Sequence, residues 1–406
     1  MLPCPRVPLM QAAVLGLVLL LASCTTSEVY VAPPVQAWQE QSPPPAEERT
    51  FRVFLVGDAG RPAIDGTDPL LNTLARHLEA AGEQAAVAFL GDNVLCCGLP
   101  DSTATTFSIR EVRLRMQLEA LEGFAGRIVF VAGNHDWQTP PPDGLARVRR
   151  QEAYIETFLD RGNTFLPDDG MPGPHAVELS DDLVLIALDT QWWLFDEDRR
   201  PHDIAPDDVL RALRDVVRTH AGKRLLVVAH HPMRSNGRHA GFVPPKAHLF
   251  PLTGLKRWAY VPLPVLGSLY PAYIRVRGGV QDLYHPRYTR MRRGFMEIFA
   301  EHDHLIYASG HDHSLQYFRQ EGENTTHYIV SGAGSGPEAI AAGRGLSFGL
   351  GMTKGFVVID AYRDGSTWMQ VWTAGTPPEG ELVFQTLVNG PRLQPRPAAA
   401  GAGRSE

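Results

Sequence analysis

The sequence of 406 residues has little of what several common protein classes depend on. It has only four cysteines, and two of them, Cys4 and Cys24, lie near the amino terminus, which excludes a small disulfide-rich fold. The pair Cys96-Cys97 remains, as buried thiols, an oxidised pair or metal ligands. With 38 Lys and Arg against 45 Asp and Glu, the net charge of -7 disfavours a nucleic-acid-binding surface. A Walker-A loop does not occur, which excludes a nucleotide-binding site of that type.

A long apolar run occurs at the amino terminus. Residues 7–23 follow a single basic residue, Arg6, and end in small residues, which is typical of a secretory signal. The end of this run, LASC, resembles the lipobox of bacterial lipoproteins. That resemblance implies cleavage before Cys24, lipidation of its thiol and anchoring in the bacterial cell envelope, because two or three acyl chains suffice. Thr25 at the next position favours the outer membrane. An ordinary cleaved signal and an uncleaved anchor are the alternatives.

Composition divides the rest of the chain into a tether, one large domain and a tail. Residues 24–49 are rich in Pro, Gln and Glu, which predicts a flexible tether. Residues 50–388 form the expected domain, and residues 389–406 have the composition of a disordered tail. An insertion at 240–292 is rich in aromatic, proline and basic residues. It is interpreted either as a lid or rim that touches lipid or a bulky substrate, or as an insertion packed on the domain.

Five short apolar runs in the domain predict strands that are buried on both faces. These runs are 51–58, 85–92, 127–136, 224–232 and 304–313. Helical patterns over 69–82 and 109–123 alternate with the early runs, which predicts a largely parallel sheet. The late runs HYIVSG, GFVVIDAY, TWMQVWTA and GELVFQTLV are expected to supply a second sheet.

Each of the five early runs ends in Asp, Asn or His. Ligands of open parallel sheets gather beyond the carboxyl ends of the strands, so we expect these side chains to share one site. They are Asp58, Asp92, Asn134, His135, His230, His311 and His313. Carboxylate and amide oxygens together with imidazole nitrogens suit two divalent metal ions placed close together. Such a pair binds phosphoester oxygens and lowers the pKa of a bound water, so that hydroxide becomes the nucleophile.

The motifs GDAG, GDN, GNHD, HHP and GHDH, in this order, resemble the five motifs of the calcineurin-like metallophosphoesterases. The match is closest to the purple acid phosphatase branch, of the tartrate-resistant type. Residues 58–60 follow the D-x-G of that branch, where most of the superfamily has D-x-H, and VSGAGSG at 330–336 is also similar. The resemblance covers roughly residues 51–375. It implies an α/β fold, a four-layer α/β/β/α sandwich with a di-metal site at the carboxyl edge of the central strands.

The resemblance also implies a role for each motif residue. The implied metal ligands are Asp58 and His313 for the first ion, Asn134, His230 and His311 for the second, and Asp92 as the bridge. His135 would contact the substrate or protonate the leaving oxygen. His239 lies nine residues after His230, the spacing of a second active-site histidine in the tartrate-resistant type. His231 is assigned mostly to packing.

The chain departs from the purple branch at one position. That branch has a tyrosine whose tyrosinate binds ferric iron, whereas Leu95 stands in the corresponding place here. Asp58, Asp92 and His313 remain for the first ion, and three protein ligands with water still form a catalytic site. We therefore expect two divalent ions, Zn, Mn or Fe, without a tyrosinate-ferric centre. Cys96 as an additional ligand and a weakened first site are the alternatives.

These features predict a phosphatase that hydrolyses phosphate monoesters by attack of a metal-bound hydroxide, assisted by His135 and His239. The alternative among enzymes is a phosphodiesterase that acts on a nucleotide or lipid headgroup. The alternative of another class is a non-catalytic envelope lipoprotein that uses the fold for binding. Leu95 and the pair Cys96-Cys97 favour that alternative, while survival of the six other expected ligands and of His135 opposes it. The expected partners are a phosphate-ester substrate and the membrane, reached through lipidated Cys24.

Overall fold

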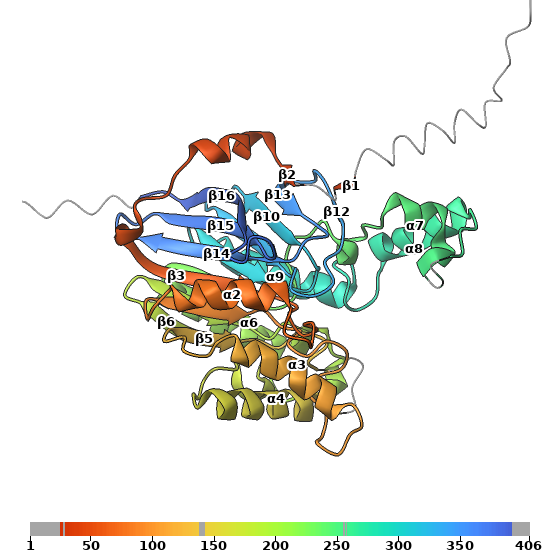
Figure 1. The fold of residues 1–406 in the computed structure, drawn as a ribbon, viewed down its shortest axis with the longest axis horizontal. Coiled ribbons are helices and arrows are strands. Elements are labelled where there is room, and N and C mark those ends of the chain that lie inside the picture. Colours follow the sequence, from red (N-terminus) through yellow and green to blue (C-terminus); the bar gives the residue numbers. More distant parts are fainter. Residues whose placement is uncertain (1–24, 27–28, 138–142, 255, 257, 392–406) are drawn as a thin grey trace, which may run out of the picture.

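The computed structural model describes residues 25–26, 29–137, 143–254, 256 and 258–391. The predicted signal, the lipidation site Cys24 and residues 392–406 of the predicted tail lie outside the described residues. Two mixed sheets pack face to face, and helices cover both outer faces (Figure 1), which confirms the four-layer α/β/β/α sandwich. Within the described part, no helix has the length and apolar character needed to cross a membrane.

The six-stranded sheet carries the first three motifs. Three neighbouring strands, β3, β4 and β5, run parallel, and β14, β15 and β16 extend the sheet in antiparallel fashion from β3. In spatial order the strands are β16 (Glu381–Asn389), β15 (Thr367–Thr373), β14 (Gly355–Tyr362), β3 (Arg49–Val56), β4 (Ala85–Phe89) and β5 (Arg127–Phe130).

The eight-stranded sheet carries the last two motifs. Four strands, β7, β8, β9 and β11, run parallel, and antiparallel strands flank them on both sides. In spatial order the strands are β2 (Tyr30–Val31), β13 (Leu346–Leu350), β10 (Leu315–Gln320), β11 (Thr326–Ser331), β9 (Leu305–Ser309), β8 (Arg224–Val228), β7 (Leu183–Ala187) and β6 (His175–Ser180). A separate pair is formed by β1 (Thr25–Thr26) and β12 (Ile340–Ala341).

Helices pack on the outer face of each sheet, except for two that stand apart. The helices are α2 (Pro69–Glu79), α3 (Phe107–Glu119) and α4 (Gly144–Leu159) on the six-stranded sheet, and α5 (Gln191–Leu194), α6 (Pro206–Thr219) and α9 (Pro286–Phe299) on the eight-stranded sheet. By contrast, α7 (Pro245–Leu249) and α8 (Pro264–Val276) project from the sandwich at one side (Figure 1). The 3-10 turns are η1 (Pro33–Glu40), η2 (Ala46–Glu48), η3 (Asp168–Gly170), η4 (Glu197–Arg199), η5 (Arg238–Ala240) and η6 (Pro251–Gly254).

Burial on both faces explains why the motif strands are continuous apolar runs. Along β3, Val53 and Leu55 lie in the core between the two sheets, whereas Phe54 and Val56 pack in the cluster under the helices. Side chains alternate between the faces of a strand, so a strand covered on both sides needs apolar residues at every position.

The predicted division of strands between the sheets was wrong. The runs GFVVIDAY, TWMQVWTA and GELVFQTLV form β14, β15 and β16, which join β3 in the first sheet, and HYIVSG forms β11 beside β9. The five motif strands are likewise shared between two mixed sheets. A strand buried on both faces carries no sequence signal for its neighbours, so local pattern could not assign them.

Part of the segment predicted as a tether lies against the domain. Strand β2 pairs with β13, and the Trp38 ring packs on Phe384 with 5.9 Å between ring centroids. The side chain of Gln385 donates a hydrogen bond to the carbonyl of Gln41 at 2.7 Å. Composition missed these contacts because a few apolar residues are enough to dock a proline-rich segment.

Candidate metal centre

The carboxyl ends of strands from both sheets meet at one edge of the sandwich. Backbone hydrogen bonds join the loops there: Gly57 N donates to Ser331 O at 2.7 Å, and Gly310 N donates to His230 O at 3.0 Å. Asp58 N donates to the carbonyl of Gly91 at 3.0 Å. The loops that carry the predicted site residues are therefore fixed to one another and not only to their own strands.

Three residues of the site have backbone conformations that are unfavourable for side chains larger than glycine. The φ angles of Asp58, Asp92 and His311 are +58°, +55° and +69°. Such left-handed conformations cost about 1–3 kcal/mol each and persist only where the surroundings determine them. At these positions the left-handed backbone conformation directs a polar side chain from the end of a strand towards the other residues of the site.

The glycine that precedes a site residue is required by close packing. A Cβ atom at Gly91 would lie 2.7 Å from His230 Nδ1, and one at Gly133 would lie 2.3 Å from both the backbone nitrogen and Oδ1 of Asp92. No other residue could bring these loops together without moving a site residue. This explains the glycine of the GDN and GNHD motifs in terms of space.

Three lone pairs converge between the two sheets. His230 Nδ1 lies 2.9 Å from the carbonyl of Leu90, and His311 Nε2 lies 3.0 Å from the carbonyl of Gln281. Because a carbonyl only accepts, these nitrogens carry the ring protons, and the other ring nitrogens are left with lone pairs. Those nitrogens, His230 Nε2 and His311 Nδ1, are 3.2 Å apart and lie 2.9 and 3.0 Å from Asn134 Oδ1. Burial and the neighbouring histidines hold the pKa of His311 well below its usual range, which keeps its ring neutral. This donor set fits a divalent cation.

A second group of acceptors lies beside the first. Asp58 Oδ1 is buried without a hydrogen-bond donor in normal geometry, and His313 Nε2 lies 3.4 Å from it. His313 Nδ1 faces the carbonyl of Gly336 at 3.2 Å, so Nδ1 carries a proton and Nε2 is the ring nitrogen that faces Asp58. Burial lowers the pKa of His313, but the contact with Asp58 and the charges of Asp58 and Asp92 raise it to about 10. The protein thus demands a proton or another cation between these two residues.

Asp92 lies between the two groups. Its Oδ1 is 3.4 Å from His230 Nε2, and ligand atoms of Asp58, Asp92 and His230 all lie within 4.8 Å of one another. Ligand atoms of His230, His231 and His311 form a second set within the same distance. A carboxylate that touches both groups is suited to bridge two cations.

His135 lies next to Asp92, and His239 lies next to His311. The backbone nitrogen of His135 donates to Asp92 Oδ1 at 2.9 Å, and its half-exposed ring places Nε2 3.9 Å from Asp92 Oδ2. The ring of His239 packs on that of His311 with 4.0 Å between centroids. His239 Nδ1 bonds with Asp282 Oδ1 at 2.8 Å. Although burial lowers the pKa of His239, this contact raises it overall.

Sequence reasoning missed the residues that the insertion contributes. Gln281 Oε1 lies 2.7 Å from His231 Nε2, and the Gln281 carbonyl fixes the His311 tautomer. His231 Nδ1 lies 2.8 Å from Thr190 Oγ1, so both nitrogens of this ring have protein partners. Asp282 is the first acidic residue after Asp215, and this was the one sequence feature that could have singled it out. The insertion is thus joined to the site rather than separate from it.

Gly60 of the D-x-G motif and Leu95 in the expected tyrosine position both have structural explanations. A Cβ atom at Gly60 would lie 2.4 to 2.6 Å from backbone atoms of residues 92–95, so no histidine fits there. Leu95, in the expected tyrosine position, is buried, and its backbone nitrogen bonds to the Gly60 carbonyl at 3.3 Å. Cys96 and Cys97 both have positive φ angles, and their sulfur atoms lie 3.5 Å apart without a disulfide. Among the described residues, neither thiol belongs to a cluster of metal-ligand atoms, so ligation by Cys96 stays a prediction.

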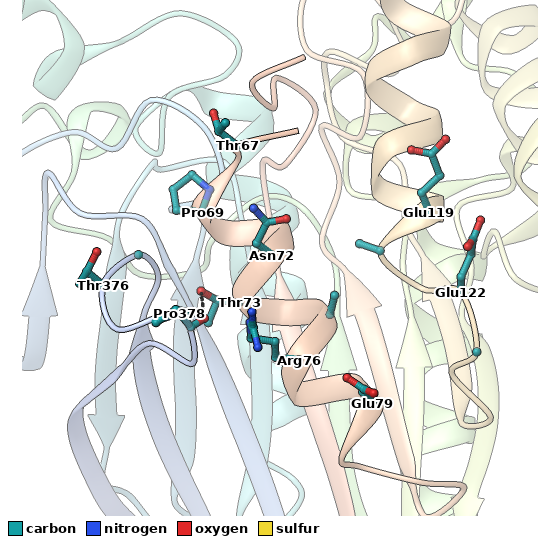
Figure 2. A pocket seen from close by; sticks show the side chains of 14 residues that line it. Thr67, Pro69, Asn72, Thr73, Arg76, Glu79, Glu119, Glu122, Thr376 and Pro378 are labelled. Atoms are coloured by element: carbon teal, nitrogen blue, oxygen red, sulfur yellow. Dashed lines mark hydrogen bonds between the residues drawn. The ribbon is translucent and has the colours of Figure 1, made fainter. Parts of the chain in front are cut away.

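A surface pocket of about 910 Å³ lies away from these residues, between α2, the end of α3 and residues 375–378 (Figure 2). Glu79, Glu119 and Glu122 line it, and Thr73 Oγ1 donates to the carbonyl of Pro378 at 3.0 Å on one wall. It contains none of the predicted site residues.

Comparisons with known proteins identify the family of the chain. The family model described as calcineurin-like phosphoesterase matches residues 51–315. Among solved structures, the chain is similar to GAP50, described as the anchor in the inner membrane complex of Plasmodium, with a TM-score of 0.51 and 16% identity over 84% of this chain and 88% of that chain. It is also similar to a structure of PhoD, with a TM-score of 0.49 and 9% identity over 85% of this chain and 73% of that chain. No curated protein sequence matches the chain. The likeness to GAP50 concerns the fold alone.

Proposed function

Because the chain belongs to the calcineurin-like phosphoesterase family, whose members act on phosphoesters with bound metal ions, we propose that it is a phosphatase that hydrolyses phosphate monoesters with two divalent ions. The observation that supports this most is the convergence of His230 Nε2, His311 Nδ1 and the Asn134 amide oxygen next to a buried carboxylate pair. Nitrogen and oxygen atoms gathered in this way fit a divalent cation.

The ligands divide into two groups around Asp92. Those that would hold the ions are Asp58 and His313 on one side, Asn134, His230 and His311 on the other, and Asp92 between them. Bound ions would activate water and polarise the phosphoryl oxygens. The Gln281 and Leu90 carbonyls orient the rings of His311 and His230 and so fix which ring nitrogen faces the ion position.

We assign transfer of a proton to the leaving group to His135 and His239. The half-exposed ring of His135 reaches the site from the solvent side and lies against Asp92. Although burial lowers the pKa of His239, the hydrogen bond from its Nδ1 to Asp282 raises it overall, which favours the protonated ring. Protonation of the departing alcohol by such a group is general acid catalysis.

Metal content tests the two-ion site directly. Residues 25–406, which contain all described elements, would be purified without chelators and analysed by elemental mass spectrometry. We expect about two equivalents per chain. Asn134→Ala should lower this number, and Asp198→Ala, which removes an exposed carboxylate, should not. One equivalent or less in the unaltered chain would contradict the two-ion mechanism, whereas the element found would separate zinc or manganese from iron.

Rates on two artificial esters test the choice of substrate class. We expect p-nitrophenyl phosphate to be hydrolysed faster than bis-p-nitrophenyl phosphate by the same metal-loaded preparation. The reverse order would show a phosphodiesterase. Equal inactivity on both, with two ions bound, would favour the non-catalytic alternative.

We further propose that the chain is exported and lipidated at Cys24, which is a prediction from the LASC sequence alone. Cells that express the full chain would be labelled with palmitate and separated into soluble and membrane fractions. Label and membrane association should both be lost in Cys24→Ser. Label retained by that variant would overturn the assignment.

A further inference from the structure

The projecting part of the insertion exposes apolar side chains to solvent. We call residues 245–276, which contain α7, η6 and α8, the arm. More than half of the exposed large hydrophobic side chains in the described chain fall between Trp258 and Val276. On α8 these are Val265, Leu266, Leu269, Tyr273 and Val276, which are 50% to 84% exposed. Scattered exposed apolar residues are ordinary, whereas a group of them marks an interaction surface.

The apolar residues of α8 form a single stripe along the helix. Val265, Leu269 and Val276 follow the spacing of i, i+4 and i+11, which places them on one face. The opposite face, with Gly267, Pro271 and Ile274, is buried. A Cβ atom at Gly267 would lie 2.1 Å from the carbonyl of His248, so α8 is held against α7 by this small residue. The helix therefore has an occupied inner face and an unpartnered apolar outer face.

Aromatic residues extend the apolar surface at the other end of the arm. Trp258 is 78% exposed, and the exposed Tyr260 accepts a hydrogen bond from Lys246 Nζ at 3.0 Å. Tryptophan and tyrosine are enriched at membrane–water interfaces because each has an apolar ring and a polar edge. Their exposure here would be unfavourable in water and favourable at that boundary.

The charge of the arm has one sign although the whole chain is acidic. No Asp or Glu occurs from Val216 to Gln281, whereas the chain has 45 acidic residues in total. The basic residues of the described part of the arm are Lys246, Lys256 and Arg275, and Arg277 follows directly after it. A surface that combines an apolar stripe with basic residues complements anionic lipid headgroups over an acyl layer.

We propose that the arm docks on a lipid bilayer that contains anionic headgroups, with the outer stripe of α8 at the boundary between headgroups and acyl chains. The helix has 13 residues, fewer than the roughly 20 needed to span a bilayer, so it lies in the plane of the interface. A second copy of the chain fits this surface less well, because a symmetric contact would bring two basic arms together.

The segments before and after the arm both contact residues of the metal centre. After α8, residues 277–280 lead back to the site. Gln281 contacts His231 and His311 there, and Asp282 contacts His239. On the other side, η5 carries His239 itself into the site. The proposal concerns binding and does not depend on the phosphatase assignment.

Vesicle binding of residues 25–406 tests this proposal without a lipid anchor. The protein would be sedimented with phosphatidylcholine vesicles that contain phosphatidylglycerol, and with phosphatidylcholine vesicles alone. We expect binding to the anionic vesicles and a loss of roughly tenfold or more in affinity for Val265→Ser/Leu269→Ser, since two inserted side chains are removed. The matched control is Ile64→Ser/Met352→Ser, which alters two exposed hydrophobic residues elsewhere and should bind normally.

Hydrogen exchange with vesicles present would locate the contact, with protection expected at residues 264–276. No sedimentation with anionic vesicles would overturn the proposal, as would equal binding by the α8 double variant and the control. A dimer seen by light scattering that dissociates in the α8 variant would assign the stripe to a second copy and would also overturn it. Retained metal content and thermal midpoint in both variants would exclude misfolding as the cause of lost binding.

Discussion

The metal-centre edge and the arm depart from ordinary globular packing in opposite senses. At the edge, the carboxylates of Asp58 and Asp92 and the ring of His230 are fully buried, although such groups normally remain in water. In the arm, Leu266 and Val276 remain in water although such groups are normally buried. Both arrangements cost free energy in the isolated chain. A bound cation would offset the cost of the buried polar groups at the edge, and an apolar layer would offset the cost of the exposed apolar groups in the arm.

The two regions also differ in how firmly they are held. The edge has hydrogen bonds between loops of both sheets, left-handed backbone at Asp92 and glycines without space for a Cβ atom. The arm is attached to the rest of the molecule mainly through α8 and η5, and its outer face has no neighbour among the described residues. We therefore expect substitutions at the edge to change activity and stability together, and substitutions on the outer face of the arm to change neither in solution.

The largest effect should follow from removing a shared ligand. Asp92→Ala deletes the carboxylate that lies next to both groups of acceptors. We expect kcat/KM on p-nitrophenyl phosphate to fall at least roughly a hundredfold, since loss of a supporting residue already costs about 10- to 100-fold at metal sites. Asp198→Ala should retain full activity. Equal rates for Asp92→Ala and Asp198→Ala would show that the metal-centre edge does not carry the activity.

A slightly smaller effect is expected from filling space behind the ligands. Gly133→Ala places a methyl group against Asp92, and overpacking of this kind costs about 1–3 kcal/mol. Gly162→Ala is the matched control, because its new methyl group would meet no atom within 4 Å. Denaturant unfolding of the metal-free proteins would measure the difference. Similar free energies of unfolding for both variants would mean that the loops are looser than their contacts indicate.

Burial of carboxylates near the edge also predicts a pH dependence. Asp189 accepts hydrogen bonds from Trp137 Nε1 and from the backbone nitrogens of Gln191 and Trp192, and burial raises its pKa to about 7. Between the ordinary pKa of about 4 and this value, the folded state binds more protons than the unfolded state. The free energy of unfolding contributed by Asp189 therefore falls as the pH rises through this window.

The variant Asp189→Asn lacks this titration, so its free energy of unfolding should fall less steeply between the two pKa values. Urea unfolding at several pH values would compare the slopes with those of the unaltered chain and of Asp198→Asn, an exposed control. Identical slopes for Asp189→Asn and the unaltered chain would contradict a raised pKa at this position.

The same contrast explains what could be predicted from sequence. Asp58, Asn134 and His311 were found because each ends an apolar run, and local order along the chain is enough to see that. The sharing of strands between two sheets was not predictable, because β14 pairs with β3 across most of the chain length. Gln281 was missed because its contact with the His311 ring is also distant in the sequence. The residues around a glutamine do not show whether it orients a histidine ring or lies on the surface.

The smallest effect concerns the arm and completes the comparison. Leu266→Ala truncates a side chain on the exposed outer face of α8, and we expect the free energy of unfolding to change by less than about 0.5 kcal/mol. Ile274→Ala, on the buried inner face of the same helix, should cost about 2–5 kcal/mol if the arm unfolds with the domain. A stabilised Leu266→Ala would fit an exposed apolar face kept for binding. A loss equal to that of Ile274→Ala would show that the outer face is covered in solution, so that a second copy of the chain and not a bilayer would be its partner.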